Sequence, residues 1–445
     1  MRLRLPPPVW LIIDKLTQNG YEAYAVGGCV RDSVLDRSPD DWDITTSATP
    51  KQVKDLFCHT VDTGLAHGTV TVLISGEGFE VTTYRIDGKY EDGRHPKDVT
   101  FTPNLSEDLK RRDFTINAMA YSPAAGLVDK FGGMQDLQRH RIRCVGEPAQ
   151  RFNEDALRIL RAVRFSAQLG FKIEDNTRKA IQELAPTLSR ISAERIQTEL
   201  VKLLMSPRPA MIREAYETNI TAVILPEFDA MMHTSQNNPH HMFSVGEHTL
   251  ETLRYAEEDR ILRIAALLHD VGKPAVRTTD EKGIDHFNGH HKTGAKLTRN
   301  ILKRLKFDNE TTDQVERLVY WHDTRTQPEE RLVRRAVYRI GEDLFPRLLK
   351  LQYADTMAQS GWYRQEKLRR LEEVGMLFEK IISEQQCISL KTLKLSGGDL
   401  IALGMKPGPE IGIVLQEALE QALDDPSRNT REYMLAFAEK RTAGR

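Results

Sequence analysis

The sequence contains few cysteines and no long apolar run. Its 445 residues include only four cysteines: Cys29, Cys58, Cys144 and Cys387. They are scattered without paired spacing, which argues against a disulfide scaffold and a cysteine-ligated zinc site and predicts a reducing, cytoplasmic setting. No apolar stretch approaches the roughly 20 residues that span a bilayer. Near the start, Asp14 and Lys15 interrupt the apolar residues, so we expect no signal peptide and no membrane partner.

The chain also has no large surplus of charge of either sign. Its 63 basic and 64 acidic residues leave a net charge of −1, which by itself disfavours a nucleic-acid partner. The average hides a basic segment at residues 139–164, which contains seven arginines and three acidic residues and therefore has a net charge of +4. This segment is either a solvated basic helix face or a phosphate-binding groove.

The length predicts about two to four domains. Up to about residue 135, short β-branched runs at 23–26, 42–46, 69–74 and 79–84 predict strands, with a helix at 50–57. After Asp136 the pattern is helical and is interrupted by prolines. We therefore expect an α+β fold, with a mixed-sheet head followed by an all-helical body. The turn cluster at 404–409 predicts a small C-terminal helical module.

Asp41 and Asp43 form a pair of carboxylates in the sequence Asp41-Trp42-Asp43, shortly after Gly27 and Gly28. On a strand, residues two apart point to the same face, so both carboxylates can enter one pocket. Oxygen ligands suit Mg²⁺, and a two-metal site can stabilise the attacking and leaving oxygens in nucleotidyl transfer. The alternative is a pair of solvated surface acids.

The surrounding sequence contains groups suited to a nucleotide. Gly27 and Gly28 lie between a predicted strand and a predicted helix, where a backbone can approach phosphates closely. Arg31 lies in the first turn of that helix and can reach a triphosphate. Glu80 lies in a β-branched run that disfavours glutamate, so it either completes a three-carboxylate metal site or faces solvent.

These segments resemble the class II tRNA nucleotidyltransferase family, the CCA-adding enzymes and their poly(A) polymerase relatives. The matching segments are GGCVRD at 27–32, DDWDI at 40–44, HGTV at 67–70, RRDFTINA at 111–118 and RFNEDALR at 151–158. Their order and spacing agree over about the first 205 residues. Asp36 departs from the glycine usual in the family, but it lies in a predicted turn.

The resemblance implies attack of the tRNA 3′-hydroxyl on the α-phosphate of CTP or ATP, with release of pyrophosphate. It implies Mg²⁺ at Asp41 and Asp43. The nucleotide contacts that it implies are Gly28, Arg31, Arg112, Asp155, Arg158, Arg161 and Arg164. With Glu80 as a third catalytic carboxylate, these residues form the predicted site.

Asp155 and Arg158 have the chemistry to distinguish bases. Cytosine and adenine both present an amino donor beside a ring-nitrogen acceptor, whereas uracil and guanine present a carbonyl and an N–H. A carboxylate and a guanidinium one helical turn apart would therefore accept C and A and reject U and G. Residues 154–165 read as one amphipathic helix whose arginines either face a cleft with an anion or pair with acids of a neighbouring helix.

Nine of the thirteen histidines lie between residues 233 and 322. The sequence around His269-Asp270 resembles the HD-domain phosphohydrolases, whose metal is held by His, His-Asp and a distant Asp. The residues that match this pattern are His248, His269, Asp270 and Asp323, with His290 as an extra ligand for a second metal. A 2′,3′-cyclic phosphodiesterase or phosphatase acting on RNA ends would fit such a site.

These observations predict four segments: a nucleotidyltransferase head at 1–138, a base-recognising helical neck at 139–206, a helical body with the HD domain at 207–345 and a tRNA-binding tail at 346–445. The predicted partners are tRNA, CTP and ATP, while the oligomeric state stays open. One alternative is an enzyme that adds only A or only CC. The CC-only members of the family that the chain resembles lack the loop expected at 87–96, so its presence favours full CCA or A addition. Poly(A) polymerase is a weaker alternative. Another is an HD phosphohydrolase whose head only binds RNA.

Overall fold

The computed structural model describes residues 2–88, 99–237, 243–361 and 363–443. The chain forms two compact units, Met1–Pro226 and Glu227–Arg445. Most of the loop expected at 87–96 lies outside the described residues. None of the described helices is long and apolar enough to cross a membrane. The predicted boundaries after residues 138, 206 and 345 divide the chain more finely than these two units and stay a prediction.

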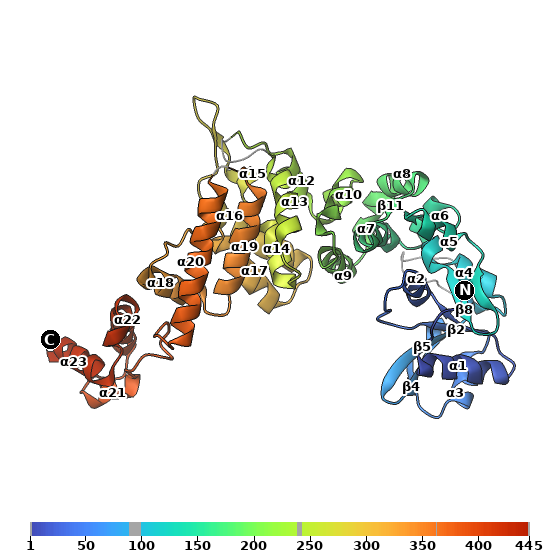
Figure 1. The fold of residues 1–445 in the computed structure, drawn as a ribbon, viewed down its shortest axis with the longest axis horizontal. Coiled ribbons are helices and arrows are strands. Elements are labelled where there is room, and N and C mark those ends of the chain that lie inside the picture. The colour runs from blue at the N-terminus through green and yellow to red at the C-terminus, as the bar shows by residue number, and fades with distance from the viewer. Residues whose placement is uncertain (1, 89–98, 238–242, 362, 444–445) are drawn as a thin grey trace. The chain divides into compact units, whose positions relative to one another are not determined.

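Unit 1 contains a seven-stranded mixed sheet with the order β3-β4-β5-β2-β1-β8-β9, in which β2 and β5 run parallel and the other neighbours antiparallel. Its strands are β1 (Ala23–Val26), β2 (Ile44–Thr46), β3 (Thr60–Gly64), β4 (Thr69–Ile74), β5 (Glu77–Thr83), β8 (Met119–Ser122) and β9 (Gly126–Asp129). A separate ribbon joins β6 (Arg85–Asp87) to β7 (Val99–Phe101). The helices α1 (Pro7–Gln18) and α3 (Pro50–Leu56) pack together, α1 against β1 and β2 and α3 against β4 and β5 (Figure 1).

Alternating burial along β5 determines which side chains face the core. Phe79, Val81 and Thr83 are buried, whereas Glu80 between them is exposed on the opposite face. This two-residue period is the one expected for a strand with one buried face. Glu80 is therefore directed away from the hydrophobic core of the head.

The remaining helices of unit 1 follow the sheet. They are α2 (Gly28–Val34), α4 (Leu105–Lys110), α5 (Gly133–Gln138), α6 (Pro148–Glu154), α7 (Leu157–Leu169), α8 (Asp175–Leu184), α9 (Ala193–Leu204), α10 (Ile212–Glu217) and α11 (Thr221–Ile224), and α12 (Pro226–His233) begins at the boundary. The short 3₁₀ helices of the chain are Leu65–His67, Thr115–Asn117, Ala185–Arg190, Pro209–Met211 and Pro426–Arg428. Helices α7 and α9 pack against each other.

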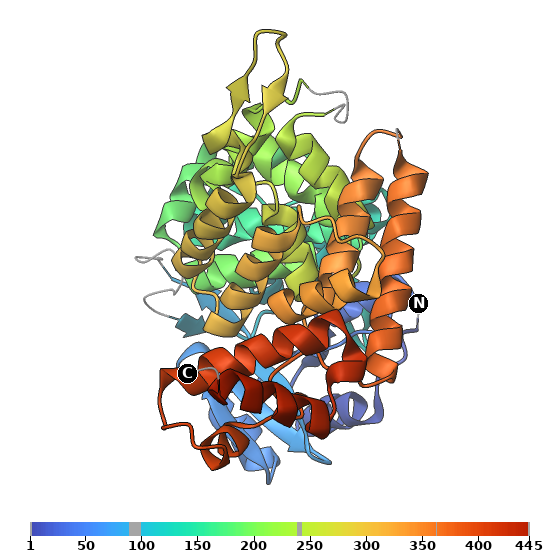
Figure 2. The ribbon, with the colours of Figure 1, turned by 90° about the vertical axis from the view of Figure 1, so that its left-hand side faces the viewer.

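Unit 2 is helical. Its helices are α13 (Val245–Tyr255), α14 (Arg260–Leu268), α15 (Lys273–Val276), α16 (His290–Arg304), α17 (Asn309–Trp321), α18 (Glu330–Ile340), α19 (Phe345–Ala358), α20 (Arg364–Ser383), α21 (Gly397–Ala402), α22 (Pro409–Asp424) and α23 (Arg431–Ala443). Helix α19 packs against α13, α14, α17 and α20. Figure 2 shows α19 and α20, in orange, running side by side.

The last three helices form a small module with its own core. Its buried residues include Leu400, Leu419 and Met434, one from each helix. The predicted turn at 404–409 lies between α21 and α22, where Gly404 has a φ of 92° that favours glycine. Figure 2 shows these helices in red, lying against one another.

The fold class is as predicted, with one sheet-containing head and helices afterwards. Among the described residues after Asp136, strands are limited to the two-residue pairs β10 (Arg141–Ile142) with β11 (Lys172–Ile173) and β12 (Thr278–Thr279) with β13 (Asp285–His286). The strands β1 and β4 have the predicted bounds. Strand β2 is shorter than predicted and begins at Ile44.

Candidate active site

The segment before β2 carries Asp41 and Asp43, of which Asp43 lines a pocket in the head. Asp41 and Asp43 precede the strand and do not lie on it, although the Val26 N–H donates to the Asp43 carbonyl at 3.0 Å and so extends the pairing with β1. A pocket of about 170 Å³ is lined by Asp43, Glu80 and Arg112, among others. The structure thus brings Glu80 from β5 to the same pocket as Asp43.

These carboxylates also influence one another electrostatically. Burial raises the pKa of Asp43, Arg112 opposes this shift and the charge of Asp41 adds to it. Burial likewise raises the pKa of Glu80, and the charges of Asp43 and Asp41 raise it further. Such a set of mutually repelling oxygen ligands is suited to a divalent cation, which would remove the repulsion.

The glycine turn lies beside the same arginine. Gly27 has a φ of +88°, which favours glycine, and a Cβ there would lie 3.0 Å from Nη1 of Arg112, so this guanidinium would have to shift to admit a side chain. Gly28 begins α2. Arg31 on this helix is buried, with Nη1 donating to Asn117 Oδ1 at 2.7 Å and Nε donating to Asp32 at 2.9 Å.

A buried acid that the sequence analysis did not assign holds the arginines of this pocket. Asp108 on α4 is fully buried and accepts two hydrogen bonds from Arg111, at 3.0 and 2.7 Å. Its other oxygen lies 3.6 Å from Nη2 of Arg112 and accepts a hydrogen bond from Thr45 on β2 at 3.1 Å. Although burial opposes ionisation, the two arginines lower the pKa of Asp108. The sequence did contain a signal for this pairing, because Arg111 and Arg112 follow Asp108 by three and four residues, a spacing that brings side chains together on a helix.

The arginines of α7 are paired with acids, as in the second of the two interpretations of this helix. Arg161 donates to Asp113 Oδ2 at 2.8 and 2.6 Å, and Arg164 Nε lies 2.5 Å from Glu199 Oε2 on α9. Asp113 is buried, and its pKa is nonetheless lowered by the charge of Arg161. The alternating arginines and acids therefore form one buried network.

The predicted continuous helix over 154–165 is wrong, because it breaks at Asp155. Helix α6 ends at Glu154 and α7 begins at Leu157, while Asp155 has an extended backbone and its Oδ1 accepts the Leu157 N–H at 3.0 Å. An aspartate that caps the following backbone favours such a break. The other oxygen, Oδ2, pairs with Arg195 of α9 at 2.7 Å, a partner that no local pattern indicated.

Arg158 lies close to this break and is nearly buried. Its Nη1 donates to Glu154 Oε2 at 2.6 Å and to the Arg151 carbonyl at 3.0 Å, and its Nη2 donates to the Arg111 carbonyl at 2.9 Å. Asp155 and Arg158 are thus brought to the same turn, each in contact with a protein partner.

Comparison with known proteins gives the family. Residues 23–143 match the Poly A polymerase head domain, 170–232 the RNA and SrmB-binding site of polymerase A, and 279–438 the tRNA nucleotidyltransferase domain 2. A CCA-adding enzyme of Lactobacillus helveticus (strain DPC 4571) is 34% identical over 433 residues, which are 96% of this chain and 95% of that protein. The chain belongs to the CCA-adding enzyme family.

Other family members agree over shorter or longer spans. The CCA-adding enzyme of Limosilactobacillus reuteri (strain DSM 20016) is 52% identical over 202 residues, 45% of this chain and 50% of that protein. The crystal structure of the Bacillus stearothermophilus CCA-adding enzyme in complex with CTP has a TM-score of 0.75 and 30% identity, and the match covers 99% of each chain. A nucleotidyltransferase of this family uses divalent metals.

The network in this CCA-adding family member makes Asp113 a residue with a large expected effect on stability. We expect Asp113→Asn to lower the free energy of unfolding by about 2–3 kcal/mol, because it leaves the partly buried Arg161 guanidinium without its nearest counter-charge. The lowered pKa of Asp113 means that this stabilisation is complete above the usual carboxyl pKa and is lost as the pH falls through the native value. Hydrogen exchange of amides in α7 would measure the effect.

The matched control is Glu217→Gln, which removes an exposed partner of Arg178 in the same unit. A surface ion pair contributes at most about 1 kcal/mol, so this variant should be nearly as stable as the parent. Equal effects of the two substitutions would contradict the buried role of Asp113.

Unit 2 contains a second group of side chains, histidines and aspartates that lie close enough together to hold a metal ion. His248, His269 and Asp270 lie together, and so do Asp270, His290 and His322. His269 Nε2 lies 3.3 Å from Asp270 Oδ2, whereas the Nε2 atoms of His322 and His290 lie 3.6 and 3.7 Å from Oδ1. Asp270 thus stands between two histidine pairs, and we call these five residues the histidine cluster.

The histidines are oriented by the helix ends that carry them. The Nδ1 atoms of His269, His290 and His322 each lie 2.7–2.9 Å from the carbonyl oxygen three residues earlier. A ring whose Nδ1–H donates to a carbonyl presents the lone pair of Nε2, which is the arrangement found in metal-binding histidines. The donor set therefore fits a divalent metal.

The fourth predicted ligand, Asp323, lines the same pocket as Asp270 and His290 but is not grouped with His248. Its side chain is half exposed and is grouped with His290 and His291, and no described contact joins it to His248. The carboxylate against His248 Nε2, at 3.0 Å, is that of Asp355 on α19, which is buried. Burial opposes ionisation of Asp355, but its hydrogen bond with His248 holds its pKa well below the usual range. Sequence alone missed Asp355 because it lies 107 positions from His248 in an apolar helix.

Proposed function

We propose that this chain adds CCA to the 3′ end of tRNA from CTP and ATP, with release of pyrophosphate. The observation that carries the proposal is the pocket in which Asp43 and Glu80 face Arg111 and Arg112. Carboxylates for a metal and guanidinium groups for a polyphosphate are what nucleotidyl transfer requires. The CCA-adding enzyme of Lactobacillus helveticus and the Bacillus stearothermophilus CCA-adding enzyme in complex with CTP support the same substrates.

In this proposal Asp41, Asp43 and Glu80 hold Mg²⁺. When bound, the metal lowers the pKa of the tRNA 3′-hydroxyl and stabilises the charge that develops on the transferred phosphate. Gly27 and Gly28 let the backbone approach the triphosphate, and Arg31 and Arg112 beside them bind its oxygens. Asp108 keeps Arg111 and Arg112 directed at the pocket, so part of the cost of ordering these side chains is met before the substrate binds.

Base selection is proposed to use Asp155 and Arg158. Each has a hydrogen-bonding partner in the structure, Arg195 for Asp155 and Glu154 for Arg158. These pairs orient the two side chains. An incoming cytosine or adenine would accept a hydrogen bond from Arg158 and donate one to Asp155, whereas uracil or guanine would leave a buried group unpaired. Arg161 and Arg164 are proposed as further nucleotide contacts that must leave or share Asp113 and Glu199.

The function is tested by incubating the protein with tRNA that lacks its 3′ end, Mg²⁺ and labelled nucleotides, singly and together. Addition of C, C and A followed by arrest supports the proposal. Addition of A alone, and only to tRNA that already ends in CC, supports the A-adding alternative. Absence of incorporation with release of phosphate from RNA ends supports a phosphohydrolase whose head only binds RNA.

A second function is favoured by the histidine cluster. We infer that unit 2 binds a divalent metal through His248, His269, Asp270, His290, His322 and Asp355 and hydrolyses phosphoesters at RNA ends, as expected of an HD domain. The support is the convergence of four imidazoles on Asp270, three of which, those of His269, His290 and His322, have the opposite ring nitrogen within hydrogen-bonding distance of a carbonyl. Asp323 keeps only an outer role in this proposal, with His290 and His291.

Substitution of Asp270 should separate the two activities. We expect Asp270→Ala to weaken Mn²⁺ binding by at least about tenfold and to remove hydrolysis of a 2′,3′-cyclic phosphate, because both histidine pairs lose their shared carboxylate. Nucleotide addition should be unchanged, since Asp270 lies in the other unit. Calorimetric titration of Mn²⁺ gives the first result, and Asp280→Ala, an exposed acid of the same unit, is the control. Undiminished Mn²⁺ binding would reject the ligand assignment.

The division into head, neck, body and tail at 1–138, 139–206, 207–345 and 346–445 is retained as a proposal, with tRNA contacted by the tail. A cytoplasmic location is likewise proposed from the four cysteines, all of which are free thiols.

A further inference from the structure

Asp355 has two oxygens with different partners. Its Oδ1 lies 3.0 Å from His248 Nε2 and accepts a hydrogen bond from Gln359 Nε2 at 3.0 Å. Its Oδ2 accepts a hydrogen bond from Arg325 Nη2 at 3.1 Å. A buried carboxylate needs such a counter-charge, because transfer of a bare ion out of water is costly. In the described structure, Arg325 is a cation in contact with it, alongside the hydrogen bond with His248.

Arg325 also faces the solvent side of the histidine cluster. It follows α17, its side chain is 38% exposed, and its Nη1 donates to the His322 carbonyl at 3.1 Å. It lines a pocket of about 410 Å³ together with Asp270, His290 and Asp355. One arginine therefore touches the proposed metal ligands and the space in which a substrate would lie.

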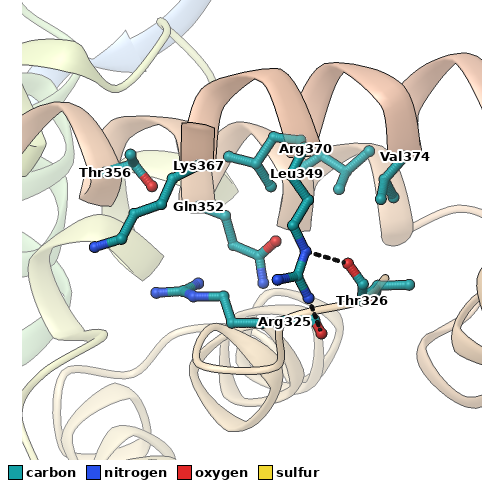
Figure 3. A pocket seen from close by; sticks show the side chains of 9 residues that line it. Arg325, Thr326, Leu349, Gln352, Thr356, Lys367, Arg370 and Val374 are labelled. Atoms are coloured by element: carbon teal, nitrogen blue, oxygen red, sulfur yellow. Dashed lines mark hydrogen bonds between the residues drawn. The ribbon is translucent and has the colours of Figure 1, made fainter. Parts of the chain in front are cut away.

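A second pocket, of about 130 Å³, lies on the other side of Arg325. Figure 3 shows the guanidinium of Arg325 and the ammonium of Lys367 extending to the same side, away from Arg370. Arg370 donates to the carbonyls of Thr326 and Arg325, at 3.0 and 2.7 Å, and so holds the backbone of this segment. Burial lowers the pKa of Lys367 and the charge of Arg325 lowers it further, which shows that the two cations lie within electrostatic reach.

A metal ion and this arginine compete for the same carboxylate. A divalent cation bound by Asp355 would stand within a few ångströms of the guanidinium, and like charges at about 4–6 Å disfavour each other. The guanidinium would then need another anion. Asp323 lies 3.9 Å from Nη2, and phosphoryl oxygens in the 410 Å³ pocket would be a better match, because a guanidinium forms two parallel hydrogen bonds with phosphate.

We propose that Arg325 pairs with Asp355 when no metal is bound. When a metal binds Asp355, the Arg325 guanidinium pairs with the phosphoryl group of the substrate instead. The inference rests on the proposed metal-dependent phosphoester site and adds a residue for binding its substrate. It makes phosphate binding depend on the metal without any contact between phosphate and Asp355. It also gives Arg325 opposite effects on two affinities, which a purely structural arginine would not have.

The test is calorimetric titration of the full chain, first with Mn²⁺ and then with inorganic phosphate at saturating Mn²⁺. Arg325→Gln keeps a hydrogen-bond donor beside Asp355 but removes the charge, so we expect it to bind Mn²⁺ about tenfold more tightly and phosphate at least about tenfold more weakly. Arg325→Lys keeps the charge but loses the two parallel N–H donors of the guanidinium. Its Mn²⁺ affinity should therefore stay near that of the parent, while its phosphate affinity falls. Arg299→Gln removes a surface ion pair between Arg299 on α16 and Glu316 on α17, and it should change neither affinity.

Different outcomes would contradict the proposed metal site and the proposed change of partner by Arg325. Parent protein that binds no Mn²⁺ would overturn the metal site and this inference with it. Parent protein that binds Mn²⁺, combined with an Arg325→Gln variant whose Mn²⁺ affinity is unchanged or weaker, would overturn the exchange alone. Phosphate that binds the Arg325→Gln variant as tightly as the parent would do the same. Circular dichroism of each variant reports whether the helical unit is folded.

Discussion

Asp43→Asn should reduce nucleotide incorporation into tRNA by at least about a thousandfold, because metal coordination contributes several kcal/mol to transition-state stabilisation. The amide is almost the same size as the carboxylate but carries no charge for a divalent ion. Asp43 is surrounded by Asp41, Glu80 and Arg112, so the loss of its charge changes the electrostatics of the whole pocket. Single-turnover incorporation of labelled CMP at saturating Mg²⁺ would measure the effect.

The head should stay folded in this variant. The contact that aligns the segment with β1 uses the backbone carbonyl of Asp43, which the substitution leaves in place. Asp62→Asn is a matched control, since Asp62 is an acid of the same sheet that pairs on the surface with Lys54. Retained transfer in Asp43→Asn, or an equal loss in Asp62→Asn, would reject the metal assignment.

Arg158→Ala should reduce the preference for CTP over UTP by about two orders of magnitude. A site that donates a hydrogen bond to the base rejects the wrong partner strongly, because a buried group is then left unpaired. Without the guanidinium, cytosine and uracil are distinguished mainly by Asp155. The measurement is the ratio of kcat/KM for the two nucleotides with the same tRNA.

The ratio is needed because Arg158 also has structural contacts. Its hydrogen bonds with Glu154 and with the carbonyls of Arg151 and Arg111 tie the break between α6 and α7 to the head, so its removal will lower the folded fraction. A ratio measured on one preparation is independent of that fraction. Arg178→Ala, which breaks a pair with Glu214 in the same unit, should lower stability and leave the ratio unchanged. An unaltered ratio in Arg158→Ala would contradict its role in base selection.

Local patterns predicted the elements of the head well where one face of a strand is buried. The alternation along 79–84 corresponds to β5, and the β-branched run at 69–74 to β4. The same patterns missed β3 and β8 and continued the helix through Asp155. Strand β8 is buried on both faces and therefore lacks alternation, and the Asp155 break depends on a cap to Leu157 that competes with helical hydrogen bonds.

The arginine pattern of α7 shows a different limit. Three arginines at successive turns predicted a concentration of positive charge, but not which anions compensate it. In the structure, Asp113 and Glu199, which come from the head and from α9, lie against Arg161 and Arg164. Side chains from elements about forty residues apart cannot be paired by helical periodicity. The nucleotide roles of these arginines stay a prediction.

For this protein, the residue types and spacing of short motifs were enough to predict the family and the sheet-and-helix order, while the roles of Asp41, Asp43, Asp155 and Arg158 stay a prediction. The family and the element order could be predicted because motifs and burial patterns are local in the chain. The tertiary structure decided which distant groups complete each site: Arg195 against Asp155, and Asp355 with Arg325 beside the histidine cluster. The physical reason is that a buried charge is stabilised only by a partner in contact with it, and packing brings such partners together from any position in the chain.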